Sequence, residues 1–165
     1  MTAIALVVGW FTWFIFYLGD APPSGDRVPK QPPDESRRLR HPSGFSFVAP
    51  PHWNLDAFDD DSIRMSPAYV DVAVRRATAI LEVSRLGAER PTATEALSRV
   101  VFLGDEAFEK MEVCRKSSFD DPAWSHYDLY VHHGDNWYYV GYGVAEERPV
   151  LPVEMRSYLE TLRWE

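Results

Sequence analysis

The sequence predicts an α+β domain, with helices packed on a mainly antiparallel sheet, behind an N-terminal transmembrane helix. Three observations support this prediction. The first eighteen residues contain no charged side chain. Several later segments alternate apolar and polar residues, which is the pattern of strands with one buried face. Helix signals occur between and after these strands, an order that is typical of α+β domains.

Residues 1–19 are predicted to form the transmembrane anchor. A helix over residues 2–19 would be about 27 Å long, close to the thickness of a hydrocarbon core of about 30 Å. Apolar side chains surround this helix on all sides, which disfavours a helix lying in the membrane plane. A cleaved signal peptide is disfavoured because no Lys or Arg precedes Arg27. We therefore expect a single-pass membrane protein that contacts the bilayer through residues 2–19.

Two arguments about the orientation of this span disagree. The tether that follows it contains five Lys and Arg residues and none precedes it, which by the positive-inside rule places the domain in the cytoplasm. However, Arg27 is the first of these residues, and Asp20 and Asp26 lie between it and the span. Domains on proline-rich tethers are also commonly extracytoplasmic. We predict an extracytoplasmic domain and keep the cytoplasmic side as the alternative.

Residues 20–42 are predicted to be an extended, semi-rigid tether. They combine many prolines with Ser, Asp, Lys and Arg, and few apolar residues are present that could be buried. Residues 43–165 are predicted to form one α+β globular domain. A hydrophobic content of 45% supplies enough apolar side chains for a core.

The globular part is acidic. Residues 43–165 contain 12 Lys and Arg against 21 Asp and Glu, and the formal net charge of the chain is −8. Such a surface repels phosphate backbones, so we expect no nucleic-acid partner. The single cysteine, Cys114, cannot form an internal disulfide, and its strand-like neighbourhood predicts a small buried hydrophobic residue.

Four strands are predicted in the first half of the domain, and each is bounded by Pro, Gly or Asp residues that favour turns. They cover residues 43–48, 52–55, 63–65 and 77–86. A helix is predicted next. Thr92 and Glu95 have the spacing of a capping box, apolar residues at 96, 97, 100 and 101 would form a buried stripe, and Gly104 would end the helix.

Three strands and a closing helix are predicted in the second half. The strands cover residues 111–116, 123–132 and 137–144, and the last two are joined by a Gly-Asp-Asn turn typical of a β-hairpin. Pro152 suits the first position of a helix, and apolar residues recur at helical spacing from there almost to Trp164.

Three segments resemble the PsbP/Mog1-like domains. Residues 44–53 read Gly-Phe-Ser-Phe-x-x-Pro-x-x-Trp, residues 137–142 form a tyrosine-rich hairpin strand, and residues 158–164 read Tyr-Leu-Glu-Thr-Leu-Arg-Trp. The resemblance implies an α/β/α sandwich, in which helices cover a sheet. The family includes photosystem accessory proteins, a regulator of a nuclear GTPase and membrane-anchored bacterial proteins of unknown role. It implies no functional residue in this chain.

The strand over residues 123–132 supplies the candidate partner face. Alternate side chains of a strand point to opposite faces, which places Trp124, Tyr130 and His132 together on the outer face. Aromatic residues are enriched in interface cores, so these three could form a patch for a protein partner. A helix that covers this face is the alternative.

The same strand contains candidate metal ligands. His126, Asp128, His132 and His133 are residue types that bind Zn²⁺ or Cu²⁺. Positions i, i+2 and i+6 of one strand span about 20 Å, too far for one ion unless His133 folds back. A polar outer face of an antiparallel strand is the simpler interpretation, so we predict no metal and no cofactor.

The sequence contains no nucleophile elbow, P-loop or dinucleotide-binding motif. We therefore predict a membrane-tethered, non-enzymatic domain that binds a protein partner or assists an assembly. A module that binds a small ligand or a metal on its histidine and aromatic sheet face is the alternative prediction.

Overall fold

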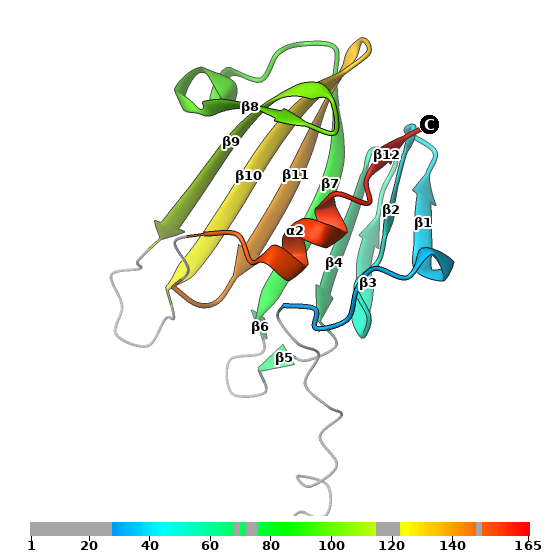
Figure 1. Cartoon of the computed structure of the whole chain (residues 1–165), viewed down its shortest axis with the longest axis vertical. Helices are drawn as coiled ribbons and strands as arrows, with labels where there is room; N and C mark the ends of the chain where they lie inside the picture. Colours follow the sequence, from blue (N-terminus) through cyan, green and yellow to red (C-terminus); the bar gives the residue numbers. More distant parts are fainter. Residues whose placement is uncertain (1–27, 68–69, 72–75, 115–122, 148–149) are drawn as a thin grey trace, which may run out of the picture.

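The computed structural model describes residues 28–67, 70–71, 76–114, 123–147 and 150–165. Its centre is a seven-stranded sheet in which all neighbouring strands are antiparallel (Figure 1). The strand order is β3 (Trp53–Phe58), β4 (Ser62–Pro67), β7 (Ala79–Gly87), β11 (Asn136–Val144), β10 (Trp124–His133), β9 (Asp105–Cys114) and β8 (Ser98–Phe102).

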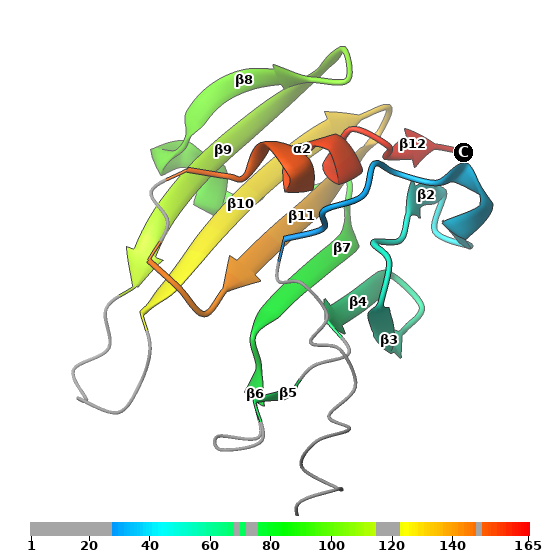
Figure 2. The same ribbon diagram turned by 60° about the horizontal axis from the view of Figure 1, so that its bottom comes forward.

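A second, three-stranded sheet lies beside the first (Figures 1 and 2). It consists of β1 (Arg38–His41), β2 (Phe45–Val48) and the C-terminal β12 (Arg163–Trp164). The remaining described elements are the short pair β5 (Val70–Asp71) and β6 (Arg76–Ala77), the 3₁₀ helices η1 (Glu35–Arg37) and η2 (Thr92–Ala96), and the α-helix α2 (Val153–Leu159).

The hydrophobic core lies between the large sheet and a layer made of α2, which crosses one face of that sheet, and the buried strand β2 (Figure 2). In β10 the side chains alternate strictly, and Ser125, Tyr127, Leu129 and Val131 are buried while the residues between them are partly exposed. Met155, Tyr158 and Leu159 of α2 are also buried. Each fully buried large apolar side chain contributes about 1.5–3 kcal/mol to stability. The alternation of buried and exposed residues in β10 therefore determines which face of the sheet is the inner one.

The predicted α+β class and antiparallel sheet are confirmed, but the helices are fewer than we predicted. The described residues contain one α-helix, and it covers one face of the sheet, not both. The predicted helix after Thr92 is wrong. Only η2 is helical, and residues Ser98–Phe102 form β8, which turns through Leu103 and Gly104 (φ 54° and 93°) into β9.

The side chains at η2 explain this difference. The N-cap residue of η2 is Pro91, which makes no side-chain capping hydrogen bond, and Thr92 is already the first residue of the helix. Thr94 donates its hydroxyl to the Pro91 carbonyl instead, over 2.8 Å, and accepts a hydrogen bond from Arg90 Nε. This local turn competes with a continuing helix. The β-branched residues that follow pack well on a pleated strand.

The predicted tether at residues 20–42 is too long at its C-terminal end. Residues 35–41 form η1 and β1, and β1 pairs with β2 in register, with His41 opposite Phe45. The Tyr158 hydroxyl lies within hydrogen-bonding distance of the backbone carbonyl oxygens of Gln31 (2.9 Å) and Pro32 (3.2 Å). The folded part of the chain therefore starts before residue 43.

Two smaller predictions also need correction. The closing helix ends at Leu159, and Trp164 belongs to β12, where it pairs with Phe45 of β2. Cys114 is exposed, not buried, because it is the last residue of β9 and its side chain lies on the solvent side of the sheet.

The predicted anchor over residues 1–19 lies outside the described residues. No helix within the described ranges combines the length and the apolar character needed to cross a membrane.

Candidate protein-binding face

The large sheet has an outer face, opposite the face that α2 covers. In β10 it carries Trp124, His126, Asp128, Tyr130 and His132, each of them partly exposed. The pairing register places one residue of β9 beside each of these positions, and one of β11 beside each except Trp124. The three residues that we predicted as a partner face, Trp124, Tyr130 and His132, therefore do lie on one face.

Two glycines in β11 shape this outer face. Gly141 lies opposite Asp128, and Gly143 lies opposite His126. Neither has a side chain, so neighbouring rings lie over their backbone. The Tyr139 ring covers Gly141, and its hydroxyl donates a 2.7 Å hydrogen bond to the Asp128 carboxylate. The rings of Trp124 and His126 approach Gly143, so that a β-carbon there would lie 3.5 and 3.4 Å from them.

The rings continue along β10 and β11 as an aromatic band, which we define as Trp124, His126, Tyr130, His132, Trp137 and Tyr139. Tyr130 and Tyr139 have ring centroids 5.3 Å apart, and His132 stacks on Trp137 at 4.7 Å. Trp124 and His126 stack at 6.0 Å at the other end. Such contacts hold the rings in place, and all of them except Trp137 remain partly exposed.

The end of the band near η2 is covered by the loop before that helix. Arg90 places its guanidinium 4.6 Å from the Phe108 ring centroid and 6.0 Å from that of Trp137. This is the geometry of a cation–π contact. Phe108 and Trp137 are accordingly buried, with 6% and 4% of their surface exposed. The accessible part of the band is thus centred on Trp124, Tyr130 and Tyr139.

Ion pairs flank the band on both sides. Arg64 of β4 pairs with Glu82 of β7 at 2.9 Å, and Lys110 of β9 pairs with Glu112. The contact with Glu112 raises the pKa of Lys110. Within the band, burial raises the pKa of Tyr139, and the hydrogen bond to Asp128 raises it further. The band therefore lies between two charged margins, with the Tyr139–Asp128 hydrogen bond at its centre.

The four candidate metal ligands do not converge. Asp128 accepts the Tyr139 hydroxyl, His132 stacks on Trp137, and His126 stacks on Trp124. His133 lies 2.9 Å from Asp105, whose same oxygen accepts the indole N–H of Trp164. In the described part of the chain no three His, Cys, Asp or Glu side chains are grouped as a metal site.

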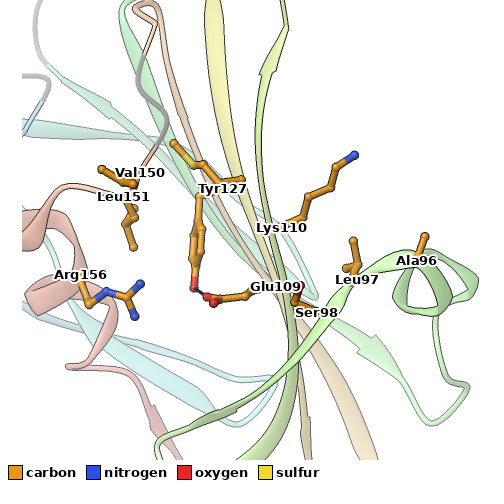
Figure 3. A pocket seen from close by; sticks show the side chains of 10 residues that line it. Ala96, Leu97, Ser98, Glu109, Lys110, Tyr127, Val150, Leu151 and Arg156 are labelled. Carbon is orange, nitrogen blue, oxygen red and sulfur yellow. Dashed lines mark hydrogen bonds between the residues drawn. The ribbon is translucent and has the colours of Figure 1, made fainter.

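A cavity that the sequence did not reveal lies at the edge of the sheet (Figure 3). Its volume is about 410 Å³, and its walls come from the start of β8, from β9 and β10, and from α2 with the residues before it. Inside it the Tyr127 hydroxyl donates a 2.7 Å hydrogen bond to Glu109. Burial raises the pKa of Tyr127, as does this hydrogen bond. Arg156 of α2 points toward the pair.

No family model and no curated protein sequence matches the chain. A crystal structure of a protein from Bacteroides thetaiotaomicron is similar over 78% of this chain, with a TM-score of 0.58 and 14% identity. The chain covers 48% of that protein, about half of its length. At this identity the likeness shows the fold alone.

Two Mog1 structures are also similar to the chain. One is the Ran-binding protein Mog1p of Saccharomyces cerevisiae, with a TM-score of 0.49, 12% identity, and coverage of 73% of this chain and 90% of that one. The other is a Mog1 point mutant, with a TM-score of 0.49, 11% identity and coverage of 78% and 95%. Similarity at this TM-score and identity gives no information about what this chain does.

Proposed function

We propose that this chain is a membrane-tethered, non-enzymatic module that binds a protein partner through the outer face of its large sheet. The observation that supports the proposal is the aromatic band. The rings of Tyr139, Trp124 and His126 pack at Gly141 and Gly143, and the band lies between the Arg64–Glu82 and Lys110–Glu112 pairs. Apolar rings within a polar rim have the composition of a protein–protein interface.

The chemistry of the band favours a protein over a nucleic acid or an anionic membrane surface. The domain is acidic, and the charges beside the band are of both signs. Tyr and Trp dominate the energetics of protein interfaces, because they bury a large area and lose few rotatable bonds. We expect a partner with an apolar centre, surrounded by both acidic and basic residues that can match the two ion pairs.

The membrane part of the proposal rests on sequence. Residues 2–19 are apolar and free of charged side chains, which is the composition of a single span. Tethering confines the domain to a layer at the bilayer surface and raises its effective concentration toward partners in the same membrane. We propose an extracytoplasmic location, so an envelope or membrane protein is the expected partner.

Photo-crosslinking tests the binding face. A benzophenone amino acid is placed at Arg64, whose side chain is 52% exposed on the outer face, or at Val153, which is 80% exposed on α2. We expect a crosslinked partner from position 64 that is absent from position 153. Adding Trp124→Ala and Tyr130→Ala should remove it. The proposal fails if position 64 gives no adduct, or if the adduct persists in the double variant.

A further inference from the structure

Strand β9, which lies next to the edge strand β8, is paired unequally on its two sides. On one side it pairs with β10 over Glu106–Cys114. On the other side β8 covers only Asp105–Glu109, because β8 starts at Ser98 opposite Glu109. Within the described ranges, residues Lys110–Cys114 thus have no strand partner on that side (Figure 1). Such an edge presents unpaired N–H and C=O groups to any extended chain that can approach it.

The cavity lies directly beside this edge, in line with β8. Lys110 and Met111 form its wall along β9, and Ala96, Leu97 and Ser98 close the end where β8 begins. Leu151 and Arg156 approach from α2 and the residues before it, across the strand from Leu97 (Figure 3). The empty volume therefore adjoins the start of the unpaired stretch of β9, at Lys110 and Met111, and the inward-facing Tyr127 in its lining shows that it reaches under the inner face of the sheet.

The charges in the cavity indicate what such a strand should carry. Arg156 forms no ion pair with any residue that the structure describes, and its guanidinium points into the cavity. Glu109 also lies in the cavity, but its carboxylate already accepts the Tyr127 hydroxyl. Met111 and Leu151 supply apolar surface beside Arg156. An apolar side chain and a carboxylate match this lining.

We propose that β9 binds an extended peptide segment of a partner protein, which adds to the sheet at Lys110–Cys114 and places an Asp or Glu side chain on Arg156. Main-chain hydrogen bonds to β9 supply affinity, as in other cases of strand addition, and the cavity supplies selectivity. Side chains of the added strand alternate, so residues on either side of the carboxylate at i±2 also face the inner side, toward Met111 and Leu151. This site uses the main chain of β9 and the Arg156 side chain, and it includes no residue of the aromatic band.

Selection from a random peptide library tests the proposal. Displayed linear decapeptides are selected on the full-length chain in a non-ionic detergent, and the recovered peptides are synthesised. We expect them to share an acidic residue flanked at i±2 by apolar residues. We also expect them to shift the backbone amide resonances of Lys110–Cys114, and to bind Arg156→Gln at least about tenfold more weakly. Arg40→Gln, on β1 of the small sheet and 74% exposed, is the matched control and should bind normally.

N-methylation of the recovered peptide distinguishes strand addition from side-chain binding. Only alternate N–H groups of an added strand face β9, so methylating one alternate set should abolish binding and methylating the other should be tolerated. Equal tolerance of both sets overturns the proposal. Recovery of no binder overturns it as well, as does a peptide that binds Arg156→Gln normally. Binding of free acetate or decanoate alone, with no peptide, would assign the cavity to a small carboxylate ligand instead.

Discussion

Replacing Gly141 by alanine should disrupt the centre of the aromatic band. Gly141 lies in β11 beneath the Tyr139 ring, and a β-carbon added there would lie 2.6 Å from Tyr139 Cζ and 2.8 Å from Cε1. Real β-carbons do not approach other atoms so closely. The backbone of β11 is held by β7 and β10 on its two sides, so the ring has to move.

The cost of this movement follows from what Tyr139 loses. Its hydroxyl donates to the ionised Asp128 at 2.7 Å, and a hydrogen bond to a charged group contributes about 1.5–3 kcal/mol. Alanine in a strand offsets about 0.5–1 kcal/mol of this loss relative to glycine, because the unfolded chain with alanine has less conformational entropy to lose on folding. We therefore expect Gly141→Ala to lower the free energy of unfolding by about 1–2 kcal/mol.

Urea unfolding and a tyrosine titration measure the two effects. The pKa of Tyr139 should fall toward its ordinary value, since the ring leaves its buried position beside Asp128. In an Asp128→Ala background the same glycine substitution should cost less, because the bond is already absent. Gly143→Ala is the matched control: its β-carbon would make only an ordinary 3.4 Å contact, so stability should not fall. An unchanged stability and an unchanged Tyr139 titration in Gly141→Ala would refute this reasoning.

Three further predictions concern other parts of the domain. Asp105→Ala removes the acceptor of the Trp164 indole N–H and the contact with His133. It should lower the free energy of unfolding in urea by about 2–3 kcal/mol and change the tryptophan fluorescence. Unaltered fluorescence would count against this prediction. Tyr158→Phe should cost about 1 kcal/mol and speed proteolysis near Gln31, whose carbonyl lies 2.9 Å from the hydroxyl. The pKa of Tyr127 is raised in the folded state, so its stabilising contribution is complete below the unfolded pKa of about 10 and is lost as the pH rises through the folded value. Tyr127→Phe should therefore flatten the fall in the free energy of unfolding that wild type shows above pH of about 10. An alkaline stability profile identical to that of wild type would contradict this.

The parts of the fold that the sequence predicted well are those whose pattern is local. Strict alternation over residues 123–132 and the turn at Gly134 predicted β10, β11 and their hairpin. The segment after Thr92 was mispredicted because β8 is an edge strand. Most of its residues are exposed, including Val101 at 78%, so its apolar residues fit a helical stripe as well as a strand, and pairing with β9 decides between them.

The predicted tether reached too far toward the C-terminus for a related reason. The proline content of residues 28–42 hides a strand, and only the turn through Pro42 and Gly44 indicates that β1 folds back on β2. Partners supplied by distant segments, such as Tyr158 on Gln31, leave no mark in the local sequence.

The candidate site residues also divide into those that a local pattern predicts and those that only the folded chain brings together. One face holding Trp124, Tyr130 and His132 follows directly from strand alternation. The cavity does not, because Glu109, Tyr127 and Arg156 come from three separate elements that only the folded chain brings together. The glycines in Gly-Tyr-Gly at 141–143 were visible in the sequence, but the rings that lie over them come partly from β10.

The affinity of the crosslinked partner for the full-length chain tests the central claim most directly. The partner is identified from its adduct at position 64, purified, and titrated against wild type, Tyr130→Ala and the control Val153→Ala. Interface aromatic residues typically cost more than 1–2 kcal/mol when truncated, so Tyr130→Ala should raise the Kd by about tenfold or more while Val153→Ala leaves it unchanged. An equal Kd for all three proteins would show that the aromatic band is not the binding face.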